Sequence, residues 1–375
     1  MDHRGSILAE MSEQGRTLDQ IRQDIDALDS SLIDLLEKRA SLAQEVGLVK
    51  GKTGRPFFTP ERERQIYAKL EKAGTKTLES RHLKAIYREI ISAARDAEQP
   101  LHIAYWGPPG TFSEIAAVET FGSSGVTMPV ATIAEVFLAV EHHQSDYGVA
   151  PIENSIAGVV PETLDMFPQT NVKICAETFI SIHHHLGTLA EDLSQIRRVY
   201  AGPQPAAQCR KWLQNHLPKA EVLDVTPTSA AGMKAAEDPE GAAIINHLTA
   251  SRYGLTLLAE HIEDNPNNRT RFVVLGANEP ERTGKDKTSL MFNLRNRPGE
   301  LYHVLGSFFR HQVNLMMIES RPAPRAQFEY MFYVDCAGHR SDENVAAAIA
   351  EVKERALETV LLGSYPSVDP NLAVI

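Results

Sequence analysis

The chain has 375 residues, of which 43% are hydrophobic, and its formal net charge is -11. This length and apolar content predict two or three domains, each able to bury a core of its own. The acidic balance excludes broad binding to nucleic acids or anionic membranes, because both need clustered cations over a large surface. A small anionic substrate needs only a few local cations.

The sequence contains no long apolar run, and its first residues, MDHRGSILAEMSEQG, lack the basic start and apolar stretch of a signal peptide. We therefore expect a cytoplasmic protein without membrane association. The cysteines are far apart and match no metal or redox spacing, which favours reduced thiols. They are Cys175, Cys209 and Cys336.

Histidines 183 to 185 raise the question of a metal site. In ETFISIHHHLGTL the residues alternate as in a strand, which would place His183 and His185 on one face and His184 on the other. No carboxylate or cysteine stands at ligand spacing within this segment. We therefore predict neither a metal nor an organic cofactor.

Composition shifts near Gln99-Pro100 and again at ANEPERTGKDK, residues 277–287, which has the texture of a linker. These two boundaries predict an all-α N-terminal domain over 16–99, a two-lobed α/β domain over 100–279 and an α+β domain over 286–366.

Apolar residues in the N-terminal part recur at intervals of three and four, the seam of a coiled-coil helix. A helix from Thr17 to Lys50 would be roughly 50 Å long, which exceeds the width of a small domain. We therefore expect a second copy of the chain to cover the seam, giving a homodimer. The seam comprises Leu18, Ile21, Ile25, Leu28, Leu32 and Leu35.

Cations on this helix support the same conclusion. Arg39 and Lys50 would lie about 16 Å apart along the axis and about 20° apart around it, within converging reach. Arg22 would lie about 25 Å from Arg39 along the axis and about 100° around it. Only an antiparallel second protomer would return an equivalent Arg22 to the site, although solvated arginines on a long helix are the commoner case.

The segment LDQIRQDIDALDSSLIDLLEKRASLAQEVGLVKGKTGRPFFTPERE resembles the helical chorismate mutase family. The resemblance covers residues 16–99 and implies an intertwined dimer that rearranges chorismate to prephenate. It assigns Arg22 and Arg39 to the substrate carboxylates, Lys50 to the ether oxygen and Glu63 to the ring hydroxyl, with Arg62 beside it. Fixed cations suit this reaction, because the breaking ether oxygen gains negative charge in the transition state.

Two positions near the end of the third predicted helix depart from the family. Ala94 stands where a serine is common, and Glu98 stands where a glutamine often donates to the ether oxygen. A carboxyl group donates only when protonated, a form that a nearby dianionic substrate favours. We therefore expect better mutase activity below neutral pH, with Gln99 as the alternative donor after a one-residue slip.

From His102 the chain alternates short apolar runs with helical patterns, which predicts two α/β lobes with a ligand between them. GPPGTFSE, residues 107–114, ends a strand and opens a helix. Thr111 and Glu114 fit a capping box there. The free N–H groups of the same turn would also bind a carboxylate, and the segment alone does not separate these alternatives.

The motifs GPPGTFSE, PIENSIAG, PQPAAQC, TPTSAA and NNRTRF occur in the order of the prephenate dehydratase family, which residues 100–279 resemble. The resemblance implies decarboxylation of prephenate with loss of the ring hydroxyl, giving phenylpyruvate. It makes Thr270 the catalytic hydroxyl, with Arg271 supplying a positive field, although strand alternation would point these two side chains to opposite faces. The candidate substrate contacts are Thr111, Asn154, Ser155, Gln204 and Ser229; Gly202 replaces a histidine common in the family.

Residues 288–365 follow a βαββαβ order, the ferredoxin-like arrangement. IESRP and RPGEL resemble the ACT regulatory domain attached to prephenate dehydratases, which implies feedback by L-phenylalanine. Glu300 replaces an alanine of the family beside the effector pocket. The implied effector residues are Gly299, Leu301, Glu319, Ser320, Arg321 and Pro322.

Together these patterns predict a bifunctional enzyme that acts on chorismate and prephenate. A non-catalytic sensor of aromatic metabolites is the alternative from another class, since a two-lobed domain joined to an ACT domain could bind and signal. A dehydratase with a degenerate mutase domain is a narrower alternative, which the Glu98 substitution keeps open.

Overall fold

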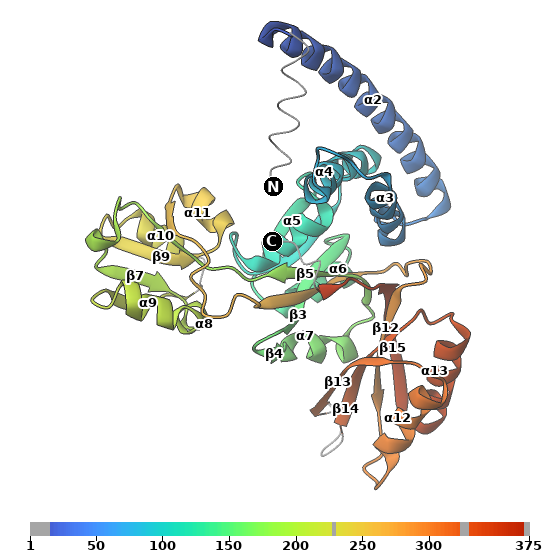
Figure 1. Ribbon diagram of the computed structural model, residues 1–375. Helices are drawn as coiled ribbons and strands as arrows, with labels where there is room; N and C mark the ends of the chain where they lie inside the picture. Colours follow the sequence, from blue (N-terminus) through green and yellow to red (C-terminus); the bar gives the residue numbers. More distant parts are fainter. Residues whose placement is uncertain (1–15, 227–229, 323–329, 371–375) are drawn as a thin grey trace.

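The computed structural model describes residues 16–226, 230–322 and 330–370, which form a helical part, a two-lobed α/β part and a C-terminal α+β part (Figure 1). Ser229 and the N-terminal residues 1–15 lie outside this description. No helix within the described ranges is long and apolar enough to span a membrane.

The N-terminal part consists of α2 (Leu18–Thr53), α3 (Pro60–Ala73) and α4 (Ser80–Glu98). Thr17 and Gln20 form a capping box at the start of α2, and Gly54 ends it in the left-handed conformation with φ 66°. Only the C-terminal half of α2 packs on α4, where Gly47 allows close approach, since a Cβ there would lie 2.9 Å from Glu98 Cα.

The N-terminal half of α2 extends away from the rest of the molecule (Figure 1). Its apolar seam is exposed to solvent in the single chain, with Leu28 69% exposed and Leu35 62% exposed. The predicted long helix is thus confirmed, and its apolar side is uncovered within one copy of the chain.

The first lobe of the middle part is a mixed sheet in the order β2-β1-β3-β11-β5, with β4 paired to β3. β1 is parallel to β2 and β3, whereas β11 is antiparallel to both β3 and β5. The strands are β1 (His102–Trp106), β2 (Val126–Val130), β3 (Tyr147–Asn154), β4 (Gly158–Val159), β5 (Lys173–Ser181) and β11 (Arg269–Gly276); the helices are α5 (Phe112–Phe121), α6 (Ile133–Glu141) and α7 (Pro161–Met166).

The second lobe has a sheet in the order β10-β6-β9-β7-β8. The chain passes between the lobes twice, from β5 to β6 and from β10 to β11, which confirms the two-lobed prediction. The elements are β6 (His185–Thr188), β7 (Arg198–Ala201), α8 (Pro203–Gln208), α9 (Arg210–His216), β8 (Glu221–Asp224), α10 (Ala230–Ala236), β9 (Gly241–Ile245), α11 (His247–Tyr253) and β10 (Thr256–Ala259).

The histidine triplet does not form one strand, contrary to the alternation in its sequence. β5 ends at Ser181 and β6 begins at His185, so His183 and His184 lie in the first crossing between the lobes. The second crossing brings Glu263 beside them, with its Oε1 2.7 Å from His183 Nδ1. A carboxylate therefore does accompany these histidines, from a segment remote in sequence.

The C-terminal part has the predicted βαββαβ order and a four-stranded sheet, β13-β14-β12-β15. Gly299 caps α12 with φ 87°, a conformation that favours glycine. The elements are β12 (Asp286–Asn293), α12 (Glu300–Arg310), β13 (Leu315–Pro322), β14 (Tyr330–Ala337), α13 (Glu343–Arg355) and β15 (Glu358–Pro366).

The C-terminal sheet and the first lobe share one hydrophobic core. Tyr333 and Tyr365 belong to the same buried cluster as Phe137 and Ile174 of the first lobe. Gly363 of β15 lies so close to β5 that a Cβ would be 2.1 Å from the Ile174 backbone oxygen. The C-terminal part is therefore packed tightly against the sheet that contains Thr270.

Candidate active sites

A cluster of charged residues lies between α2 and α4. Lys50 Nζ is 2.8 Å from Glu98 Oε2 and donates to the Phe57 carbonyl at 3.1 Å. Arg39 donates to the Ile90 carbonyl at 3.1 Å, so Arg39 and Lys50 both face α4. Lys50 and Glu98 are largely buried, which strengthens their electrostatic interaction relative to a surface pair.

Glu98, and not Gln99, faces this cluster. Gln99 is the C-cap of α4 and is exposed to solvent. The one-residue slip considered for the sequence is therefore not supported by the geometry.

Glu63 lies beneath the cluster at the start of α3. Burial raises the pKa of Glu63, and the Arg95 guanidinium, 3.5 Å away, opposes this effect. Arg95 also lies over the rings of Phe58 and Phe121, at 5.4 and 5.5 Å from their centroids. Arg95 was not among the predicted site residues, and its signal in the sequence is its place on the buried face of the amphipathic helix α4.

Arg22 and Arg62 lie outside this cluster in the single chain. Arg22 is exposed on the N-terminal half of α2, 3.8 Å from Asp19. Arg62 is exposed on α3 and donates to Gln65. One copy of the chain therefore brings together Arg39, Lys50 and Glu98 with Glu63 nearby, and leaves two of the predicted cations apart.

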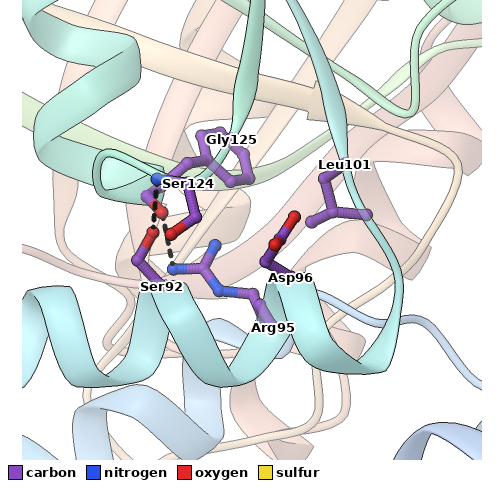
Figure 2. Close-up of a pocket in the computed structure, with 7 residues that line it drawn as sticks. Ser92, Arg95, Asp96, Leu101, Ser124 and Gly125 are labelled. Carbon is purple, nitrogen blue, oxygen red and sulfur yellow. Dashed lines mark hydrogen bonds between the residues drawn. The ribbon is translucent and has the colours of Figure 1, made fainter.

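A small pocket lies where α4 meets the first lobe (Figure 2). Across it, the Ser124 N–H donates to Ser92 Oγ at 3.0 Å and Arg95 donates to the Phe121 carbonyl at 3.1 Å. The pocket lies at a junction between domains, and Arg95, which pairs with Glu63, forms part of its lining. Its lining residues are Ser92, Arg95, Asp96, Leu101, Phe121, Ser124 and Gly125.

Thr270, the second residue of β11, lies directly opposite Asn154, the last residue of β3. Asn154 Nδ2 donates to Thr270 Oγ1 at 2.9 Å, and Thr270 is only 8% exposed. Asn154 Oδ1 accepts from the N–H groups of Ile156 and Ala157, which fixes the orientation of the amide. The threonine oxygen is thus an acceptor, and its proton remains available to another partner.

Two further residues, Asn268 and Ser155, hold the end of β3 against the start of β11. Asn268 Oδ1 accepts from Asn154 Nδ2 at 2.8 Å, and Asn268 Nδ2 is buried without a hydrogen-bond partner in the described structure. Ser155 Oγ accepts from the Arg269 N–H at 3.0 Å. Ser155 therefore holds the start of β11, and Asn268 is a further site residue that was not predicted, although it stands in the NNRTRF motif.

Arg271 does not supply a positive field to Thr270. Its side chain points to the opposite face of the sheet, is 4% exposed and pairs with Glu177 at 2.8 Å and Asp335 at 2.5 Å. The expectation was wrong because consecutive strand residues alternate between faces. The neighbouring cation is neutralised in the interface with the C-terminal domain.

The turn before α5 also differs from its prediction. Thr111 is the N-cap but makes no side-chain capping bond, and Glu114 Oε2 accepts instead from the Gly110 N–H at 2.5 Å. The Gly110 carbonyl accepts from Asn246 and Thr249 of the second lobe, each at 2.8 Å. The turn therefore connects the lobes, and no capping box forms.

The second lobe carries one described candidate substrate contact, Gln204. Gln204 is exposed on α8.

At the two crossings between the lobes, His183, His261 and Glu263 place one possible metal-ligand atom each within 4.8 Å of one another. In this arrangement Glu263 accepts from the His184 backbone N–H at 2.9 Å, and burial lowers the pKa of His184.

The effector residues implied by the sequence divide between two faces of β13. Glu319 and Arg321 are half-buried, whereas Ser320 and Pro322 are exposed. Arg321 reaches across the domain interface to Asp165 of α7, with nitrogen to oxygen distances of 2.8 and 3.1 Å. Gly299 and Leu301 lie at the start of α12, where Leu301 packs against the domain core.

Family models match three consecutive parts of the chain. Chorismate mutase type II matches residues 21–99, prephenate dehydratase matches 103–280 and the ACT domain matches 288–354. The solved prephenate dehydratase of Arthrobacter aurescens, a complex with L-Phe, is 35% identical with a TM-score of 0.68, covering 73% of this chain and 92% of that one.

Two curated relatives extend over nearly the whole chain. A bifunctional chorismate mutase/prephenate dehydratase of Aquifex aeolicus is 40% identical, covering 93% of this chain and 98% of the relative. A protein of the same name from Stutzerimonas stutzeri is 39% identical, covering 95% and 99% respectively. With the helical, two-lobed and ACT domains in the same order, the chain belongs to the family of bifunctional chorismate mutase/prephenate dehydratases.

Proposed function

We propose that Thr270 carries the dehydratase reaction as a positioned proton donor. Electrons from the departing carboxylate of prephenate expel the ring hydroxyl as the ring aromatises, so this oxygen must gain a proton as it leaves. The observation that supports Thr270 is the 2.9 Å contact from Asn154 Nδ2. Since the amide donates, the threonine proton is free to point at the leaving oxygen.

The mutase site is completed by a second copy of the chain. Arg39 and Lys50 hold one substrate carboxylate and the ether oxygen, while Arg22 of the partner subunit holds the other carboxylate. The exposed seam of α2 supports this homodimer, because 69% exposure of Leu28 and 62% of Leu35 would leave a large apolar surface in water. Glu63 accepts a hydrogen bond from the ring hydroxyl.

Phenylalanine, the amino acid formed from phenylpyruvate, is the proposed feedback effector at the ACT domain. The matching ACT family and the relative solved with L-Phe support this assignment. Glu300, which replaces an alanine of the family, is half-buried at the start of α12. We also propose a cytoplasmic location, which the buried free thiols of Cys175, Cys209 and Cys336 fit.

A single assay tests the two activities and the feedback by phenylalanine. The purified protein is given chorismate or prephenate separately, and prephenate and phenylpyruvate are measured with and without phenylalanine. Product from both substrates, with phenylalanine lowering the yield of phenylpyruvate, is the expected result. Activity on prephenate alone would indicate the degenerate mutase, and no activity on either substrate would leave the metabolite sensor.

A further inference from the structure

A buried cluster of charged side chains joins β11, the strand that contains Thr270, to the C-terminal domain. Arg271 of β11 donates to Glu177 of β5 at 2.8 Å, to Asp335 of β14 at 2.5 Å and to the Tyr365 hydroxyl of β15 at 2.9 Å. One guanidinium thus holds strands from both domains.

The remaining members close the cluster. Lys287 Nζ lies 2.7 Å from Glu177 Oε2, and Ser289 donates to Asp335 Oδ1 at 2.5 Å. Two cations therefore face two carboxylates, all with side chains 5% exposed or less. Glu153 is a further carboxylate at 3.9 Å from Arg271, but it stands at the exposed edge. We call Arg271, Glu177, Asp335, Lys287, Ser289 and Tyr365 the interdomain clamp.

Arg271 of the interdomain clamp is adjacent in sequence to Thr270, the proposed proton donor. Thr270 precedes Arg271, and their side chains leave β11 on opposite faces. The register of β11 against β3 shifts between Arg271 and Phe272, so regular pairing is interrupted immediately beside these two residues. A change in the position of β14 or β15 would pull on Arg271 and so move Thr270 relative to Asn154.

We infer that Arg271 is a positioning residue through which the ACT domain sets the placement of Thr270. The inference rests on the proposed role of Thr270 and on effector binding at the ACT domain. An effector that shifts the ACT sheet lowers dehydratase activity by moving the guanidinium held by Asp335 and Tyr365. By linkage, weakening this contact reduces the coupling between effector and substrate without removing either site.

Two full-length variants and one matched control test the inference. Asp335→Asn keeps the side-chain shape but removes the charge that faces Arg271. Tyr365→Phe is milder, because it removes one buried hydroxyl and keeps the ring. Tyr333→Phe is the control, since Tyr333 is equally buried and its hydroxyl also crosses the interface, but to the Leu164 carbonyl of α7 at 2.9 Å rather than to β11.

The deciding quantity is the ratio of dehydratase rates without and with saturating phenylalanine. We expect Asp335→Asn and Tyr365→Phe to reduce this ratio at least about 5-fold, within the range of typical allosteric couplings. Calorimetry should still detect phenylalanine binding, and the mutase rate of the same chain should stay normal, which reports that each variant is folded. Tyr333→Phe should keep the wild-type ratio.

Wild-type ratios in both clamp variants would overturn the inference, as would an equal loss in Tyr333→Phe. Should Asp335→Asn fail to fold, Tyr365→Phe decides alone. Failure of the proposed function is seen separately: full activity of Thr270→Val would refute the role of Thr270. A wild-type enzyme insensitive to phenylalanine would refute the effector. In that event the inference is decided by kcat for prephenate. This kcat should fall several-fold in both clamp variants and stay unchanged in Tyr333→Phe.

Discussion

The side-chain amide of Asn154 donates a hydrogen bond to the hydroxyl oxygen of Thr270, across 2.9 Å and from the neighbouring strand. Asn154 is the last residue of β3 and Thr270 is the second residue of β11, so their alignment depends on the pairing register of these antiparallel strands. This contact assigns direction to the threonine hydroxyl: its oxygen accepts, and its proton is left for the substrate.

Replacing Thr270 tests the need for that proton. Thr270→Val has nearly the same shape but no hydroxyl, and we expect it to lower dehydratase kcat at least about 100-fold, the usual contribution of a general acid. Thr270→Ser should retain most of the activity. Steady-state kinetics with prephenate measure both, and the mutase rate of the same preparations is the control. Equal rates for the valine and serine variants would contradict the role of the hydroxyl.

Asn154→Asp tests the direction of the hydrogen bond. The carboxylate can still accept from the Ile156 and Ala157 N–H groups, so the turn should fold. It would also accept the Thr270 proton and repel the anionic substrate. We expect a loss of about 100-fold or more in kcat/KM for prephenate. Near-normal kinetics would show that the orientation of the Thr270 hydroxyl is irrelevant.

Glu98→Gln tests the mutase site. Glu98 contacts Lys50 at 2.8 Å, so a substrate that engages Lys50 also meets this carboxyl group. It donates to the ether oxygen only when protonated, so the wild-type mutase rate should fall as the pH rises. The amide of the variant donates at every pH, and its rate should be nearly flat between about pH 5 and pH 8. Parallel profiles for the two proteins would remove Glu98 from the mechanism, and Gln99→Ala should behave as wild type.

Leu28→Lys tests the dimer. Leu28 lies in the exposed seam of α2, and burying a lysine in a helix–helix interface is costly. We expect the variant to be monomeric by light scattering, to lose mutase activity at least about 10-fold and to keep its dehydratase activity. Gln23→Lys adds the same charge roughly 140° around the helix and should remain dimeric. A Leu28→Lys protein with wild-type mass and mutase rate would exclude the seam as the interface.

The thiols provide a test of packing. Burial raises the pKa of Cys336 to about 12 and raises the pKa of Cys175 and Cys209 as well. Only the thiolate reacts, and a raised pKa means that it forms only at higher pH. A thiol reagent at pH 8 should react with the folded protein far more slowly than with the urea-unfolded protein. Rapid modification of the folded chain would contradict the described burial.

Local patterns in the sequence determined the architecture. The spacing of Leu18 to Leu35 predicted the long helix, and the strand and helix periodicities predicted the two lobes and the βαββαβ domain, because each depends on neighbours a few residues apart. The motif NNRTRF also located Thr270. These patterns do not fix the orientation of side chains at the ends of elements. The capping box predicted for Thr111 and Glu114 therefore does not form in the structure.

Only the tertiary structure decided which remote residues meet. Arg271 stands beside Thr270 in the sequence, yet strand alternation turns it toward Asp335, a residue of another domain. In the same way, Glu263 reaches His183 because two crossings between the lobes run side by side. Such contacts depend on sheet order, strand register and domain packing, which are set by the whole chain. Sequence alone determined the elements and the chemistry of the motifs; folding determined which charge serves the site and which holds the domains together.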